Sequence, residues 1–137
     1  MPLTLEIVTP EKKAYTGTVD SVVLPTTTGE IQVLPGHIPL LTQIEPGDLI
    51  VSASGKVEHL AVDRGFAQLV GDTVTVLAEG AIHVEAIDFA KVEEAQAKAE
   101  KALADAAKSG QDPAEIERLE TVVRFAIVQK LAKNRRR

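Results

Sequence analysis

The sequence predicts an α+β fold, in which an N-terminal antiparallel β-sandwich of about ten strands is followed by a C-terminal antiparallel two-helix hairpin. Residues 1–86 alternate apolar and polar side chains and are interrupted by turn residues at short intervals, which is typical of a sandwich or barrel. From residue 87 the apolar spacing changes to three and four, which is typical of helices. The charge changes there too, because residues 1–86 carry 4 Lys/Arg against 11 Asp/Glu and residues 87–137 carry 11 against 9. We therefore divide the chain into a sandwich, 1–86, and a hairpin, 87–137.

The strands predicted within residues 1–86 follow a period of two. Leu3, Leu5 and Ile7 share one face of the first strand, and a strand pair follows Gly17, with its apolar residues at 19 and 22–24. Further strands are expected at 30–34, 49–53, 56–62, 66–70, 73–78 and 81–86. Two-residue turns at Ser54-Gly55 and Gly71-Asp72 predict tight hairpins.

Residues 29–48, GEIQVLPGHIPLLTQIEPGD, contain three prolines, and we call them the proline segment. Each proline fixes φ, removes an amide donor and moves the residue before it toward extended geometry. The sequence therefore predicts a stiff, folded-back connection between strands. Its apolar residues Leu40, Leu41 and Ile44 must then be covered by this domain or by another protein.

The predicted helices each carry one apolar stripe. In the first helix the stripe consists of Val92, Ala95, Ala99, Ala102 and Ala106, and in the second it consists of Ile116, Leu119, Val123, Ala126 or Ile127, and Leu131. Ser109-Gly110 ends the first helix, and Asp112-Pro113 caps and begins the second, with Glu115 placed to close a capping box. Two helices with an alanine stripe bury little apolar area, so we expect the hairpin to dock weakly and to exchange its docking surface.

Composition excludes several classes of function. The chain has no cysteine, so disulfides, thiolate catalysis and cysteine-based zinc sites are excluded. The N-terminus lacks the features of a signal peptide, and no stretch reaches about 18 uninterrupted apolar residues. We expect a soluble protein on the cytosolic side, associated with a membrane only through partners.

No catalytic or metal site is predicted. The three histidines share neither a helix face nor a short ligand spacing, no serine lies in a strained G-x-S-x-G turn, and no glycine-rich phosphate loop is present. His59 and His83 are expected to point outward from strands. His37 has two interpretations, a loop histidine bonded to nearby backbone and a contact with a partner.

Three motifs carry a resemblance to a known family. The proline segment resembles, almost position by position, the signature of the epsilon subunit of bacterial and plastid F-type ATP synthases. Residues 63–67, DRGFA, together with 72–78, DTVTVLA, are similar to that family's second signature, and Ile87-Asp88 is similar to its third. The motifs span most of the chain in the family's order.

The resemblance implies a non-catalytic subunit of the central rotor, which joins the gamma shaft to the membrane c-ring in proton-driven ATP synthesis. The proline segment would contact these two partners, with Glu30 and His37 as polar contacts to the c-ring and residues 40–42 near gamma. The full set of interface residues implied is Glu30, Val33, His37, Leu40, Leu41 and Thr42. The hairpin would regulate ATP hydrolysis, blocking rotation when extended and releasing it when folded onto the sandwich.

The family also implies roles for charged residues of the hairpin. Some bacterial members bind ATP through Ile/Leu-Asp-x-x-Arg-Ala, and this chain keeps Asp88 but replaces the arginine with Lys91 and offers Lys98 where another arginine would help. Lysine lacks the planar fork that holds phosphate, so no cofactor is implied beyond a weak ATP site at Ile87, Asp88, Lys91 and Lys98. Asp88 has a second interpretation as a helix N-cap.

No acidic residue follows Glu120, so the C-terminal end is a run of cations. The resemblance makes Arg124, Lys130 and Lys133 inhibitory contacts to the beta subunit of the alpha/beta hexamer when the hairpin is extended. Residues 135–137, all arginine, would add long-range attraction. The other interpretation is a solvated tail that complements the helix dipole. Nucleic acid is not expected, because these charges occupy only one helix end of a protein that is acidic overall.

The resemblance implies a peripheral location on the cytoplasmic face of the bacterial inner membrane, with the thylakoid stromal face as the alternative. A different functional class stays open beside it. The chain could be a standalone β-sandwich adaptor or a nucleotide-sensing module whose hairpin closes on a ligand.

Overall fold

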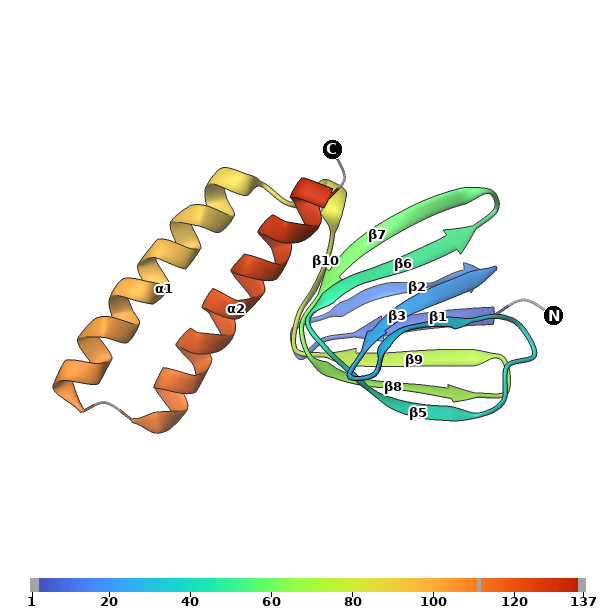
Figure 1. Cartoon of the computed structure of the whole chain (residues 1–137), viewed down its shortest axis with the longest axis horizontal. Helices are drawn as coiled ribbons and strands as arrows, with labels where there is room; N and C mark the ends of the chain where they lie inside the picture. The colour runs from blue at the N-terminus through green and yellow to red at the C-terminus, as the bar shows by residue number, and fades with distance from the viewer. Residues whose placement is uncertain (1–2, 111, 136–137) are drawn as a thin grey trace.

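A computed structural model describes residues 3–110 and 112–135, which form a β-sandwich and a helical hairpin (Figure 1). The strands are β1 Leu3–Val8, β2 Lys13–Val19, β3 Ser21–Thr26, β4 Gly29–Val33, β5 Leu40–Ile44, β6 Gly47–Ala53, β7 Lys56–Val62, β8 Gly65–Val70, β9 Thr73–Ala78 and β10 Ala81–His83. A 3-10 helix, Val84–Ala86, leads to helix α1, Phe89–Ser109, and helix α2, Pro113–Arg135. The predicted fold class is confirmed.

The strands form one continuous sheet that folds over on itself. Its order is β10-β7-β6-β3-β5-β8-β9-β1-β2, and β4 pairs with β3. All neighbours are antiparallel except β1 and β9, which run parallel. Alternate residues point inward, so that Leu5, Leu49, Leu60 and Leu69 are almost completely buried in one aliphatic core. Both predicted hairpin turns are present, and Ser54 and Gly55 have the positive φ values, 53° and 78°, that a tight turn between twisted strands requires.

The proline segment differs from the prediction in one strand. The strand expected at 30–34 is present as β4, but the segment also contains β5, which was not predicted, because Leu40–Ile44 follows Pro39 and pairs with β8. Ile44 is completely buried in the core, whereas Leu41 is 71% exposed. The segment therefore supplies both core and surface.

Two further strand boundaries were wrong. Strand β2 begins at Lys13 and not after Gly17 as predicted, because the register opposite β1 continues to that residue. The last strand ends at His83, and residues 84–86 turn into a 3-10 helix that redirects the chain toward the hairpin. The chain therefore leaves the extended conformation one turn before Ile87, where helical geometry was expected to begin.

The helix ends follow the predicted capping residues. The Asp88 carboxylate accepts a hydrogen bond from the Lys91 backbone amide at 3.2 Å, and Gly110 closes α1 in the left-handed conformation with φ 66°. Asp112 accepts from the Ala114 amide at 3.0 Å and so caps α2. The Glu115 carboxylate pairs with Arg118, a partner that the predicted capping box did not include.

Helix α2 lies between α1 and the sandwich (Figure 1). Its apolar side chains Phe125, Val128 and Ala132 pack against Ala61 and Val84 of the sandwich. The predicted inward stripe is wrong at its end, since Leu131 is 56% exposed. Of the alternatives Ala126 and Ile127, Ala126 is buried and Ile127 is 43% exposed. Helix α2 packs against α1 on one side and against the sandwich on the other, so a single apolar stripe cannot predict both contact faces. Within the described residues, no helix is long and apolar enough to cross a membrane.

Candidate functional site

One broad face of the sandwich lacks charge although the domain is acidic. The outward side chains of β5, β8 and β9 are apolar or neutral, and the register places them in adjacent rows. We call these residues the uncharged face: Leu41, Gln43, Phe66, Gln68, Val70, Thr73, Thr75 and Leu77. Four of them are large hydrophobic residues that are more than half exposed. An exposed apolar patch of this size is typical of a surface that a partner or a ligand covers.

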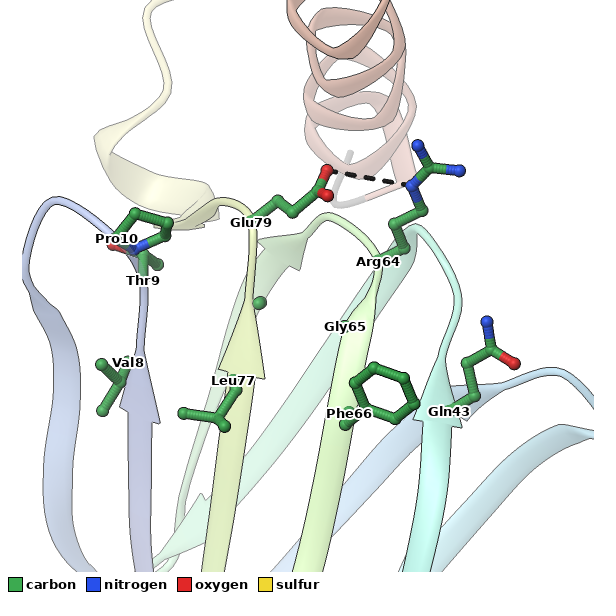
Figure 2. Close-up of a pocket in the computed structure, with 10 residues that line it drawn as sticks. Val8, Thr9, Pro10, Gln43, Arg64, Gly65, Phe66, Leu77 and Glu79 are labelled. Atoms are coloured by element: carbon green, nitrogen blue, oxygen red, sulfur yellow. Dashed lines mark ion pairs between the residues drawn. The ribbon is translucent and has the colours of Figure 1, made fainter. Parts of the chain in front are cut away.

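A hollow of about 570 Å³ lies at one end of the uncharged face (Figure 2). Its floor includes Phe66, Leu77 and the end of β1 with Pro10, and its rim carries Arg64 and Glu79, whose charged atoms are 3.8 Å apart. Gly65 is required here, because a Cβ at this position would lie 1.8 Å from the Leu77 carbonyl oxygen. The hollow therefore depends on the close approach of β8 and β9.

A buried ion pair joins α2 to the sandwich beside this rim. Arg124 donates from Nε to Asp63 Oδ1 at 2.9 Å and from Nη2 to Asp63 Oδ2 at 3.1 Å. The same Nη2 donates to Glu79 at 3.0 Å. The Asp63 side chain is 1% exposed and also accepts from the Arg64 amide. These bonds raise the pKa of Arg124 above its ordinary value, chiefly through the hydrogen bonds to Asp63.

The contact surface between α2 and the sandwich, which we call the seam, has few apolar contacts: Phe125 on Gly80 and a small buried cluster. A Cβ at Gly80 would lie 2.9 Å from the Phe125 ring, so glycine is what allows the ring to rest on the sandwich backbone. Ala61, Val84, Ile87 and Ala132 are the buried members of the cluster behind it. Small side chains on both sides let helix and sheet approach closely.

The other predicted inhibitory cations also have partners within the fold. Lys130 donates to Gln96 at 3.0 Å, lies 3.7 Å from Glu93 and sits 5.7 Å from the centre of the Phe89 ring. Lys133 donates to the Val84 carbonyl at 3.5 Å. The run of cations is thus compensated by groups from α1 and from the sandwich, which a count along the sequence cannot detect. Of the arginines at 135–137, the side chain of 135 and the whole of 136 and 137 lie outside the described residues.

A second cavity, of about 370 Å³, lies between the two helices and β10. Asp88 and Lys91 contribute to its lining, but most of the lining is apolar, including Val92, Val122 and Phe125. Lys98 is not part of this lining, since its side chain is 78% exposed and pairs with Glu94 at 3.3 Å. Ile87 is buried in the seam. The structure brings together two of the four residues of the predicted ATP site.

Each histidine has a partner of its own. His59 alternates with the core residue Leu60, which agrees with its predicted outward direction, but it is partly buried and bonds to Asp48 at 2.9 Å. His83 is half-exposed and lies 3.6 Å from Glu58. His37 bonds to the Ile38 carbonyl at 2.7 Å, as its backbone interpretation predicts. No group of three potential metal ligands occurs among residues 3–110 and 112–135.

Comparison with known proteins identifies the family. Residues 2–84 match the family described as ATP synthase, Delta/Epsilon chain, beta-sandwich domain. The chain is 37% identical to ATP synthase epsilon chain 2 of Ralstonia nicotianae, over 99% of this chain and 100% of that protein. It is 42% identical to the ATP synthase epsilon chain of Prochlorococcus marinus over 72% of this chain and 77% of that one. This chain belongs to the ATP synthase epsilon chain family.

Solved structures agree on the fold. A chain of the Euglena gracilis mitochondrial ATP synthase, solved with OSCP, F1 and the c-ring, superposes with a TM-score of 0.68 at 23% identity, covering 96% of this chain and 81% of that one. A chain of the Tetrahymena thermophila mitochondrial central stalk and c-ring gives 0.56 at 13% identity, covering 97% of both. The predicted resemblance to the epsilon family is confirmed, and with it the assignment as an accessory, non-catalytic ATP synthase subunit.

The structure changes the list of interface residues predicted for this epsilon-family chain. Val33 is completely buried in the core and cannot touch a partner, because it points inward from β4. Leu40 and Thr42 are half-buried, and Leu41 and Glu30 are exposed. Sequence reasoning missed Leu34 and Ile38, which are 50% and 76% exposed in the proline segment. It also missed Phe66 and Leu77, although their period-two alternation with buried residues was visible.

Proposed function

We propose that this chain is a rotor subunit of an F-type ATP synthase that links the gamma shaft to the c-ring and regulates ATP hydrolysis through its hairpin. Family membership supports the first part, because relatives that match over most or all of their length are epsilon chains of ATP synthases. In this proposal the sandwich, residues 1–86, binds the rotor and the hairpin, residues 87–137, is regulatory. The chain associates with the membrane peripherally, through the complex.

The uncharged face carries the proposal for gamma. It joins the exposed Leu41 to Phe66 and Leu77, whereas Leu40 and Thr42 alternate with Leu41 on β5 and are half-buried. A partner covering this face would desolvate no charge. Burying such a patch gives a favourable free energy of about 25 cal/mol per Å² of apolar area. A shaft of helices with an apolar stripe is the partner of suitable chemistry.

The proline segment carries the proposal for the c-ring. Leu34 and Ile38 are exposed beside the half-buried His37 on one stiff loop, and the exposed Glu30 lies on β4, the strand that leads into this loop. A loop of this kind can contact the polar loops that a membrane ring exposes at the membrane surface, without entering the membrane itself. We place this contact on the cytoplasmic face of the bacterial inner membrane, with the thylakoid stromal face as the alternative.

The experiment is a titration of an ATPase core, depleted of its epsilon subunit and taken from the same source, with the full chain. We expect co-elution with the core and slower ATP hydrolysis. Leu77→Asp places a charge on the uncharged face and should weaken association at least about tenfold. Val57→Asp is the matched control, because Val57 is 56% exposed, Leu77 is 54% exposed, and Val57 lies on β7 outside this face.

The controls separate the parts of the proposal. Equal binding of both variants would remove the uncharged face from the gamma interface. Failure of the unmodified chain to associate would remove the rotor assignment and favour the standalone adaptor.

We keep the weak ATP site at Asp88 and Lys91 as a proposal for the same chain and for the nucleotide-sensing alternative. Both residues line the cavity between the helices, while Lys98 would have to turn inward to help. A ligand that binds only the folded chain raises its melting temperature. An unchanged melting temperature at millimolar ATP, in both the chain and Lys91→Ala, would remove this site.

A further inference from the structure

We propose that Asp63, Glu79 and Arg124 form a latch that holds the hairpin on the sandwich, so that Arg124 stabilises the docked state. This inference rests on the regulatory function proposed above for the hairpin. It adds a role in the docked state to the role that the family resemblance implied for Arg124 in the extended state. The three residues come from three separate parts of the sequence and meet only when the hairpin is docked.

The geometry of the pair is that of a specific contact. The guanidinium presents two parallel donors to the two oxygens of Asp63, at 2.9 and 3.1 Å, and this bidentate arrangement is stronger and more directional than a single contact. Asp63 is almost completely buried and Arg124 is 27% exposed. Surface ion pairs contribute little, but a desolvated and bidentate pair is sensitive to the loss of either partner.

Asp63 has little to compensate it when Arg124 is absent. Apart from Arg124, its side chain accepts a hydrogen bond from the Arg64 amide, which carries no charge, so a docked hairpin without the guanidinium would leave a carboxylate desolvated and its charge unbalanced. The docked state and the Arg124 pair are therefore coupled. Departure of α2 would return Asp63 to water.

The apolar part of the seam is small enough for the ion pair to matter. Its buried members are Ala61, Val84, Ile87 and Ala132, which are mostly small, with Phe125 resting on Gly80. Apolar contact is not directional, whereas the bidentate pair fixes which side of α2 faces the sheet. The latch thus sets both the register and much of the free-energy difference between docked and undocked hairpin.

Arg124 is engaged while the hairpin is docked. Its Nε and Nη2 groups bond to Asp63 and Glu79 there, so they become available to another subunit only when the hairpin leaves the sandwich. A substitution at Asp63 separates the latch from a contact to the hexamer, because it leaves Arg124 itself unchanged. It would not weaken a contact between Arg124 and the hexamer, whereas breaking the latch releases the hairpin and deepens inhibition.

The first test uses the isolated full chain and needs no partner. Because the chain lacks cysteine, single cysteines replacing the exposed residues Lys56 on β7 and Lys101 on α1 can carry a donor and an acceptor fluorophore. Asp63→Asn keeps the size of the side chain and removes its charge. We expect the undocked population to rise at least about tenfold in Asp63→Asn and in Arg124→Gln.

Arg118→Gln is the matched control for Arg124→Gln. It removes an arginine from the same helix, but Arg118 pairs with Glu115 within α2 and does not touch the sandwich. The distance between the two fluorophores in Arg118→Gln should equal that in the unmodified chain. Should Asp63→Asn disturb the sandwich itself, Arg124→Gln still tests the pair from the helix side. Unchanged distances in both Asp63→Asn and Arg124→Gln would overturn the latch.

The second test separates the latch from the regulatory function. Added to the depleted ATPase core, Asp63→Asn should slow hydrolysis more than the unmodified chain at equal occupancy. A longer label distance without any change in hydrolysis would refute the proposed regulation and leave the latch standing. Relief of inhibition by Arg124→Gln with unchanged label distances would instead leave Arg124 only the contact to the hexamer and overturn the latch.

Discussion

The sandwich and the hairpin seam are held together by different means. In the sandwich, backbone hydrogen bonds join neighbouring strands all along the sheet, and the aliphatic core, with Leu49, Leu60 and Leu69 at its centre, is closed on all sides. At the seam, helix α2 packs on the sheet, so side chains and not backbone hydrogen bonds hold the two together. It is held by Phe125 on Gly80, by a small apolar cluster and by the Arg124 pair.

This difference predicts that the two regions respond separately to perturbation. Removing a core side chain destabilises every strand, because packing in a closed core is shared. Removing a seam contact shifts only the docking equilibrium, since few residues of the sandwich depend on α2. A subunit built in this way can keep its anchor while its hairpin changes position.

The largest effect is expected in the core. Leu49→Ala should lower the free energy of unfolding of the sandwich by about 3 kcal/mol, because it removes transfer free energy and leaves a cavity among completely buried neighbours. Thermal unfolding followed by circular dichroism should show a melting temperature lower by about 10 °C or more. Val57→Ala, at an exposed position, is the control. A small change in Leu49→Ala would mean that the core is less closed than its burial indicates.

A smaller effect is expected at the seam from Gly80→Ala. The added Cβ would lie 2.9 Å from the Phe125 ring, so the ring must move and docking should weaken by about 1 kcal/mol. The labelled chain described above measures the docked fraction, and the melting temperature of the sandwich should change little. Gly17→Ala is matched to it, because its Cβ would meet the Tyr15 side chain at an ordinary 3.5 Å. Equal docked fractions in the two variants would show that Phe125 is not an anchor.

The same difference explains how much the sequence could predict. Local signals were sufficient for the sandwich, where period-two alternation located most strands, and for the helix ends, where Asp88, Gly110 and Asp112 lie at the predicted caps. The parallel neighbour of β1 and the strand at Leu40–Ile44 were missed, because pairing between distant segments leaves no periodic signal. The buried position of Val33 was missed because the family motif implied an interface role there, although the alternation along its strand places the side chain inward.

The seam was beyond sequence reasoning for a related reason. Asp63 and Arg124 are 61 positions apart, and each had a plausible separate role, one in a family signature and one in a basic tail. Only the docked geometry joins them. Gly80 gave no signal either, since the need for a glycine arises from the Phe125 ring and not from its own backbone conformation.

The smallest effect is expected at the end of the hairpin, in Glu115→Gln. Arg118 donates hydrogen bonds to the Glu115 carboxylate and lowers its pKa below the ordinary value of 4.5, so the pair stabilises the first turn of α2 above that pH and is lost as the pH falls through the folded-state pKa. Both side chains are exposed, and a pair of this spacing changes helix opening only about twofold. Amide exchange in residues 113–118 should therefore quicken about twofold at pH 7 in Glu115→Gln, and the difference from the unmodified chain should vanish in acid. Glu117→Gln removes the same charge from the same turn without touching that pair. If the amides of the two variants exchanged alike at every pH, the faster exchange would come from the helix charge alone, and the pair would not stabilise the first turn of α2.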